Sequence, residues 1–302
     1  MISFFHRNEI DESKYNDCIS KSGQDMLYAY SWYLDTVVEQ WGALVLDDYQ
    51  AVMPIPYQKK YTIQYVHPPL WILQLGVFSQ TEKYSIEDFI NTLQEKFRFI
   101  ELRLNAKNSL GFENYPLSKK NMYQELDLRK GYDTVKQLYK SDRKKDLRRA
   151  EKHQLIEKWA DNPDRFIDLF KNNVGLRTPE VQEKDYNNLK ALMSVCVQKQ
   201  AGEILSVYEG EQLVASAFFI KEGKTVTILC SSTDFSNRKN GANTFLIDRA
   251  ISKYSNDFNT FNFGGSSMPS IAKYFLSFGA TQVEYPFLKI NKLPSLLRLF
   301  KS

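Results

Sequence analysis

The stretch from residue 225 to residue 288 constrains the fold of this chain more than any other part. An apolar run, Val226–Cys230, leads into a polar loop and then into an amphipathic helical pattern that opens at Gly241. A second apolar run, 258–263, ends in a glycine pair, and a short helix (271–278) and a last strand (281–288) follow. This order predicts a helix that begins directly after a strand, and the N–H groups and dipole of such a helix start favour a bound phosphate or carboxylate.

The loop before this helix ends in a short motif. Its residues are Arg238, Lys239, Asn240, Gly241, Ala242 and Asn243. The motif resembles the Arg/Gln-x-x-Gly-x-Gly/Ala segment with which GNAT (Gcn5-related) acyltransferases hold the pyrophosphate of coenzyme A. Arg238 and Gly241 match it, whereas Asn243 replaces the small third residue. The resemblance implies that Arg238, Gly241, Ala242 and Asn243 bind the donor. By itself the segment is equally typical of a polar loop with a glycine at a helix start.

A second resemblance covers nearly the whole chain. Residues 141–152, SDRKKDLRRAEK, are similar to the basic helix that precedes a GNAT-like half in the Fem peptidoglycan aminoacyltransferases. The glycine pair in Phe263-Gly264-Gly265 and the later Phe278-Gly279-Ala280 are similar to the late pattern of the same family. Fem proteins are built of two tandem GNAT-like halves. The resemblance therefore implies an α/β fold of α+β character, with two tandem GNAT-like domains, each a mixed sheet flanked by helices.

The residues themselves also indicate a repeated architecture. Two hairpin patterns, 42–53 and 203–220, begin about 160 positions apart. Each is followed by an apolar run, a helix and a strand, and every element keeps an offset near 160 although the sequences are barely similar. We therefore expect an N-terminal GNAT-like domain over residues 1–130 and a C-terminal one over residues 131–302.

A basic helix is predicted at the start of the second domain, over residues 134–152. Eight Lys or Arg residues lie between 136 and 152, and Lys136, Lys140, Lys144 and Arg148 recur every four residues, which places them in one stripe. The stripe is either a solvated face or a docking surface for phosphates or carboxylates. On the second interpretation Lys144 and Arg148 bind an anionic acceptor where the two domains meet.

Composition excludes several other classes of protein. The chain has 302 residues, 43% of them hydrophobic and 25% charged, with a net charge of +4, which is typical of a globular protein and small for a dedicated nucleic-acid binder. No apolar run approaches the ~20 residues of a membrane-spanning helix. The first residues lack the pattern of a signal peptide, and the three cysteines have neither disulfide nor zinc spacing. We expect a cytoplasmic protein with no integral membrane segment and no metal.

Acyl transfer to an amine needs a base, a bound ester or thioester donor and a hydrogen-bond donor for the developing oxyanion. Two candidate catalytic residues lie near the end of the strand that begins at Val226. They are Ser232, at the end of this strand, and Asp234, in the loop after it. Many GNAT enzymes place a tyrosine acid four residues before the late glycine, which here is Phe275, so Tyr274 is the candidate one residue earlier. Gly264, Gly265 and Ser266 are the candidates for binding the acceptor. Each residue also has a plain structural interpretation, as a turn, surface or core position.

Three classes of function remain open. The first is an N-acyltransferase that uses acyl-CoA as co-substrate, without a permanently bound cofactor, or aminoacyl-tRNA, and that modifies an amine on an anionic small molecule or a cell-wall precursor. The second is a non-catalytic ligand-binding protein with the same fold. The third, a nucleic-acid-binding module built on the basic helix, is weakened by the acidic residues interspersed in the stripe. The sequence makes no prediction about the oligomeric state.

Overall fold

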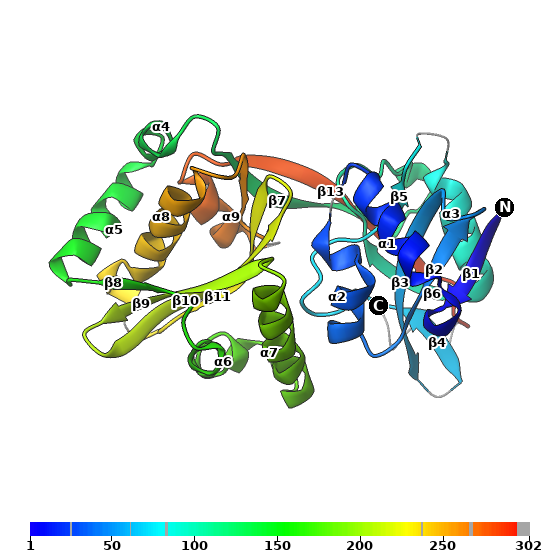
Figure 1. Ribbon diagram of the computed structural model, residues 1–302, viewed down its shortest axis with the longest axis horizontal. Helices are drawn as coiled ribbons and strands as arrows, with labels where there is room; N and C mark the ends of the chain where they lie inside the picture. Colours follow the sequence, from blue (N-terminus) through cyan, green and yellow to red (C-terminus); the bar gives the residue numbers. More distant parts are fainter. Residues whose placement is uncertain (25, 61, 82–83, 237, 266–267, 295–302) are drawn as a thin grey trace. The chain divides into compact units, whose positions relative to one another are not determined.

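The computed structural model describes residues 1–24, 26–60, 62–81, 84–236, 238–265 and 268–294. The chain forms two compact units (Figure 1). Unit 1 consists of residues 1–121 and the C-terminal segment from 284 onward, and unit 2 of residues 122–283. In both units alternating apolar residues form the strands, and helices with one apolar face cover the sheet.

Unit 1 contains a mixed sheet in the order β1-β2-β3-β4-β6-β13. The short strand β5 also pairs with β3, at Ala51 and Val52. Its helix α3 is capped by Ser85, whose hydroxyl accepts a hydrogen bond from the Asp88 N–H. The helix buries Phe89, Ile90 and Leu93 against the sheet. The elements of unit 1 are β1 (Ile2–His6), α1 (Glu12–Lys21), α2 (Ser31–Val37), β2 (Trp41–Leu46), β3 (Ala51–Lys60), β4 (Ile63–Val66), β5 (Phe78–Ser79), α3 (Ile86–Lys96) and β6 (Phe99–Arg103).

Unit 2 contains a mixed sheet in the order β7-β12-β11-β10-β9-β8. Helices α6 and α7 cover one face, and α4, α5, α8 and α9 cover the other (Figure 1). The elements are β7 (Lys119–Asp127), α4 (Tyr132–Gln137), α5 (Ser141–Lys152), β8 (Ile156–Trp159), α6 (Pro163–Asn172), α7 (Glu183–Gln198), β9 (Gly202–Glu209), β10 (Gln212–Glu222), β11 (Thr225–Thr233), α8 (Ala242–Tyr254), β12 (Thr260–Asn262) and α9 (Pro269–Leu276). The strand β13 (Thr281–Asn291) begins in unit 2, and its residues from 284 onward belong to unit 1.

The two units share one pairing pattern: three antiparallel ladders, one parallel ladder and one further antiparallel ladder. The parallel pair is joined by a crossover helix in each case, α3 between β4 and β6 and α8 between β11 and β12. The predicted fold class is therefore confirmed: each unit is a mixed sheet flanked by helices.

The compact units differ from the predicted division at residue 130. The last strand of the first half, β7, pairs through Glu125–Asp127 with β12 of unit 2. The last strand of the chain, β13, pairs through Phe287–Asn291 with β6 of unit 1. Each sheet is thus completed by the strand that ends the other half. Hydrophobic periodicity specifies that a segment is a strand but leaves its pairing partner open, so the sequence pattern does not indicate these two pairings.

The single basic helix predicted over residues 134–152 is wrong. The chain forms two helices, α4 and α5, and Lys140 between them has an extended backbone at φ −63° and ψ 159°. Tyr139 is buried there with its ring 5.1 Å from that of Phe278, and the Lys140 N–H donates to the Ser277 carbonyl oxygen at 2.9 Å. Burial of one apolar side chain thus interrupts the charged run, and Lys136 lies on a different helix from Lys144.

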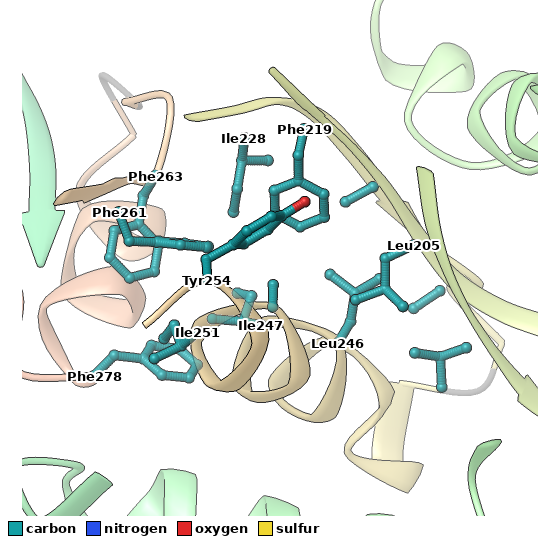
Figure 2. Close-up of a cluster of buried hydrophobic side chains, with 14 of the residues drawn as sticks. Leu205, Phe219, Ile228, Leu246, Ile247, Ile251, Tyr254, Phe261, Phe263 and Phe278 are labelled. Carbon is teal, nitrogen blue, oxygen red and sulfur yellow. The ribbon is translucent and has the colours of Figure 1, made fainter. Parts of the chain in front are cut away.

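The core of unit 2 lies between the sheet and α8. Tyr254 of α8 lies at its centre, among Phe219 of β10, Ile228 of β11 and Phe261 of β12 (Figure 2). Its hydroxyl donates to Glu203 at 2.9 Å, which satisfies the buried polar end of the ring. This packing fixes the position of α8 against β11, and with it the position of the helix start that follows the strand.

Candidate acyl-transfer site

The ladder between β11 and β12 ends early. It pairs Thr225–Thr227 with Thr260–Asn262, whereas β11 continues to Thr233. We call the end of this ladder the fork. On the other side of β11 the register with β10 shifts, because Phe218 and Phe219 pair with Cys230 and Ile228 and leave Leu229 as an extra residue. Such a β-bulge bends its strand and increases the local twist, which accounts for the departure of β11 from β12 just after Thr227.

The start of α8 lies against α5. Gly241 has a left-handed backbone, φ 84° and ψ 8°, and a Cβ atom there would collide with the carbonyl oxygen of Asp146 on α5. Only glycine combines this conformation with so close an approach. The Ala242 N–H, in the first turn of α8, donates to Asn240 Oδ1 at 2.9 Å. The predicted donor loop and the predicted basic helix therefore form one neighbourhood.

Asn240 and His153 are held by one carboxylate. Glu209, at the end of β9, accepts from Asn240 Nδ2 at 2.9 Å and contacts His153 Nδ1 at 2.7 Å. Asn240 is 4% exposed and immediately precedes Gly241. The hydrogen bonds from Asn240 and His153 lower the pKa of Glu209. The loop before α8 is thus fastened to the end of the β9–β10 hairpin and to the residue that follows α5.

A buried polar cluster connects α5, α8 and α9. The Thr244 Oγ1 atom lies 2.9 Å from Arg143 Nη1, 3.0 Å from Asp146 Oδ2 and 3.0 Å from the Tyr274 hydroxyl. Arg143 also pairs with Asp146 at 3.0 Å and stacks on the Tyr274 ring at 4.3 Å. The Thr244 hydroxyl donates to Asp146, so Tyr274 donates its proton to Thr244. Burial raises the pKa of Tyr274 to about 12, which keeps this proton in place at neutral pH.

The three predicted catalytic residues lie in different surroundings. Tyr274 belongs to the cluster just described. Asp234 accepts at Oδ1 from the N–H and the hydroxyl of Ser236 and at Oδ2 from Gln212, so it organises its own turn. Ser232 is 3% exposed and its hydroxyl donates to the Leu169 carbonyl oxygen of α6 at 3.3 Å.

Ser231 is a site candidate that the sequence pattern did not single out. It pairs with Ala217, which lies in the core beneath α8, and side chains of directly paired residues point to the same face of a sheet. Ser231 is half-buried and therefore presents its side chain on the α8 side of β11, beyond the fork. The β-bulge at Leu229 reverses the alternation, so the sequence pattern alone could not distinguish Ser231 from Ser232.

The predicted substrate-binding residues are spread over two places. Gly264 and Gly265 follow β12 with φ near 75°, and a Cβ atom on Gly265 would come within 2.8 Å of Tyr123 Cβ. Lys144 and Arg148 are exposed on α5, and Lys144 Nζ donates to the Gln137 carbonyl oxygen. Asn243 is half-buried in the first turn of α8. The side chain of Arg238 and all of Ser266 lie outside the described residues.

A polar row crosses the sheet at the fork, on the face opposite α8. Thr227 of β11 pairs with Asn262 of β12, and Asn262 pairs with Glu125 of β7. The neighbouring row of Val226, Phe261 and Leu126 lies in the core under α8, so the polar row points the other way. Burial raises the pKa of Glu125, and a hydrogen bond with Tyr123 opposes that shift.

Within the described part of the chain, no group of three or more His, Cys, Asp or Glu residues could hold a metal ion. In the same residues no helix is long and apolar enough to span a membrane. The cysteine thiols are free and burial raises their pKa, for Cys196 to about 12, so they stay protonated at neutral pH.

Residues 136–274 match the sequence profile of the acetyltransferase (GNAT) domain. This chain carries a GNAT domain. The match begins in α4 and ends in α9, and it contains the fork, Gly241 and the cluster around Thr244. A comparison with curated proteins found no match.

Solved structures extend the fold likeness beyond the GNAT domain. The crystal structure of FemX has a TM-score of 0.69 and 13% identity, over 99% of this chain and 100% of FemX. L-PGS from Bacillus licheniformis has a TM-score of 0.54 and 12% identity, over 96% of this chain and 94% of its own. A tandem GNAT protein from the clavulanic acid biosynthesis pathway has a TM-score of 0.53 and 9% identity, over 98% and 100%. Nearly the whole chain therefore has a Fem-like, tandem GNAT fold.

Proposed function

We propose that the protein is an N-acyltransferase that moves an acyl or aminoacyl group from a donor to an amine on an anionic small molecule or cell-wall precursor. The donor is acyl-CoA or aminoacyl-tRNA. The observation that carries this proposal is the fork, where β11 leaves β12 at a bulge immediately before the loop that opens α8. A strand edge that is no longer paired can donate N–H groups to a carbonyl oxygen, and the adjoining helix start can bind the donor's phosphates.

In this proposal each part of the site has one chemical role. The acyl carbonyl lies along β11 beyond Thr227, with the Ser231 hydroxyl on the α8 side as a further hydrogen-bond donor. The first turn of α8, with Gly241, Ala242 and Asn243, takes the phosphates together with the Arg238 side chain. Asp234 and Ser232 support the loop and the strand, and Gly264 and Gly265 allow the chain to turn away at the end of β12.

The basic surface of α5 bears on the identity of the donor. Lys144, Lys145, Arg148, Arg149 and Lys152 are exposed on a helix whose inner face touches the loop before α8. Both a nucleotide-linked thioester and a tRNA would bring phosphates to this place. The two donors differ in the number of phosphates that contact the protein. A tRNA contacts many cations, so its affinity falls steeply with salt, whereas acyl-CoA carries few phosphates.

Thermal unfolding with acetyl-CoA, CoA and ATP tests donor binding. Acetyl-CoA should raise the midpoint of unfolding by several degrees and ATP should not. Arg238→Ala should weaken the binding of acetyl-CoA by roughly 1.5–3 kcal/mol, the range for one charge-assisted contact. Binding that is unchanged in this variant would remove the loop from the site.

Two further measurements separate the alternatives. Release of the CoA thiol from acetyl-CoA in the presence of primary amines distinguishes an enzyme from a protein that only binds the donor. Titration with tRNA at low and physiological salt distinguishes the two donors, since a steep salt dependence without a shift by acetyl-CoA favours aminoacyl-tRNA. No binding of either donor would refute the proposal.

A further inference from the structure

Glu125 of β7 occupies an unusual place in unit 2. It is a half-buried carboxylate in the interior of a sheet, one strand away from the pair that separates at the fork. Strands are spaced about 4.8 Å apart, so Glu125 and Thr227 of β11 lie roughly 10 Å apart across Asn262. A glutamate side chain and one acceptor amine, or one water molecule, together span this distance.

Within the described part of the chain Glu125 forms no salt bridge, and its charged form is favoured by a hydrogen bond with Tyr123. Tyr123, two residues away on the same strand face, is the titratable side chain that acts on it. The neighbouring strands present neutral groups, which are Asn262 of β12, Thr227 of β11 and, on β13, Thr281, whose hydroxyl donates to the Glu125 carbonyl oxygen at 3.4 Å. A carboxylate placed without a cation in such surroundings takes up a proton more readily than one in water.

Unit 1 provides an internal contrast. There Glu101 of β6 also lies in the interior of the sheet, but His67 Nδ1 lies 3.1 Å from its Oε2 atom and Lys289 Nζ lies 3.2 Å from Oε1. These partners lower the pKa of Glu101, the hydrogen bond from His67 most, against the effect of burial. Two partners in unit 1 therefore favour the anionic form of Glu101, whereas burial in unit 2 favours the protonated form of Glu125.

A second buried polar group marks the same row. Thr227 is 0% exposed and its Oγ1 atom has no hydrogen-bond partner among the described residues. An unsatisfied buried hydroxyl costs free energy, commonly about 1–3 kcal/mol, unless a ligand or water satisfies it. Thr227 and Glu125 flank Asn262 on one face, and the described residues leave the hydrogen-bonding capacity of the Thr227 hydroxyl unused.

We infer that Glu125 is the general base that takes the proton from the acceptor amine, and that the amine reaches the donor on the Glu125–Asn262–Thr227 face of the fork. The inference rests on the proposed acyl transfer and assigns to it a residue and a side of approach. The donor's carbonyl lies along the part of β11 beyond Thr227 that no longer pairs with β12. An amine above Asn262 is then between the carbonyl carbon and the carboxylate.

With a thioester donor, two proton transfers accompany the replacement of the carbon–sulfur bond by a carbon–nitrogen bond. The ammonium group of the acceptor gives one proton to the Glu125 carboxylate, and the freed lone pair forms a bond from nitrogen to the carbonyl carbon. The carbonyl π electrons move to oxygen and return when the carbon–sulfur bond breaks, and its electron pair leaves with sulfur. A second proton from the new nitrogen centre moves to the thiolate. The products are an amide, a thiol and protonated Glu125, which loses its proton to solvent.

The test measures thiol release from acetyl-CoA, with a weakly basic primary amine, with a strongly basic one and with water alone as acceptor. Glu125→Gln should slow release at least tenfold near neutral pH and leave the thermal shift by acetyl-CoA unchanged. The defect should shrink as pH rises, since the amine then loses its proton without help. Glu211→Gln, which removes an exposed carboxylate in the β9–β10 turn, is the matched control and should behave as the unmodified protein.

A loss of equal size at every pH, or no loss, with acetyl-CoA binding retained, overturns the inference and leaves the proposed function standing. An unmodified protein that binds neither acetyl-CoA nor tRNA refutes the proposed function itself. If Glu125→Gln fails to fold, Tyr123→Phe takes over the test. It removes the hydrogen bond that lowers the pKa of Glu125, so the acidic limb of the pH profile should move to higher pH, and an unmoved limb counts against Glu125 as the base.

Discussion

A Cβ atom on Gly241 would collide with the backbone carbonyl oxygen of Asp146. Gly241 lies immediately before α8, and Asp146 lies in the middle of α5. The basic helix is therefore packed against the backbone that forms the candidate phosphate site. A shift of one of these elements must displace the other, because the contact is with main-chain atoms, which cannot move aside as a flexible side chain would.

Gly241→Ala should therefore both destabilise the protein and abolish donor binding. The left-handed backbone costs an alanine about 1–2 kcal/mol, and the clash adds about 1–3 kcal/mol. Gly210→Ala is the matched control, since Gly210 has φ +59° and no atom within 4 Å of the added Cβ. Urea unfolding should give a small loss for Gly210→Ala and a clearly larger one for Gly241→Ala. Equal losses would contradict the close packing of α5 on the loop.

Asn240 and Glu209 should behave as a coupled pair. Asn240→Asp keeps the acceptor for the Ala242 N–H but sets a negative charge against Glu209, and Glu209→Gln removes the carboxylate that accepts from Asn240. In the double variant a glutamine amide can donate to the new aspartate. The coupling free energy should be about 0.5–3 kcal/mol in a double-mutant cycle on unfolding. Strict additivity would show that the loop does not depend on this contact.

Substitution of Ser231 should affect the rate of the reaction, whereas substitution of the adjacent Ser232 should affect the stability of the protein. Ser231→Ala should slow thiol release by roughly tenfold to a hundredfold with stability unchanged, because it removes a donor beside the carbonyl. Ser232→Ala should cost about 1 kcal/mol of stability, through the lost bond to Leu169, and leave the rate per folded molecule intact. Rates corrected for the folded fraction decide between them, and a larger rate loss in Ser232→Ala would reverse the assignment.

These cases mark how far the sequence could predict the structure. Elements with strong periodicity, such as α8 and the β9–β10 hairpin, were predicted within a few residues. The break at Tyr139 and Lys140 was missed, because a helical charge pattern carries no sign of the aromatic contact with Phe278. Glu125 was missed because its significance arises only when β7 pairs with β12, and neither periodicity nor motif encodes that pairing.

Acid should weaken the attachment of β8 to β9 through Asp161. Burial would raise the pKa of this carboxyl, but Lys158, at 2.7 Å, and the Tyr208 hydroxyl more than offset it and hold the pKa at about 2. A folded-state pKa below the unfolded value stabilises the protein above pH ~4, and this contribution is lost as pH falls from ~4 to ~2. Its size is roughly 2 kcal/mol. Asp161→Asn should flatten the fall in stability over this range, as measured by urea unfolding at several pH values.

The exposed cations of α5 allow a test of whether this face of the protein binds an anionic acceptor or a tRNA. Lys144 and Arg148 lie on the outer side of a helix whose inner side, Arg143 and Asp146, is fixed to α8. Lys144→Glu with Arg148→Glu should leave the fold and the thermal shift by acetyl-CoA intact, because neither side chain belongs to that inner contact. The double substitution should strongly weaken the binding of an anionic acceptor or of a tRNA at low salt, since a row of cations concentrates anions.

The matched control is Lys59→Glu with Lys60→Glu, which makes the same change of net charge on the β3–β4 hairpin of unit 1. A general effect of charge would appear in both double variants, whereas a local contact appears only in the α5 variant. Salt distinguishes the two further, because screening over a Debye length of about 10 Å at 0.1 M removes long-range attraction and leaves direct contacts. Full activity of the α5 variant at every salt concentration would show that this face of the helix is merely solvated.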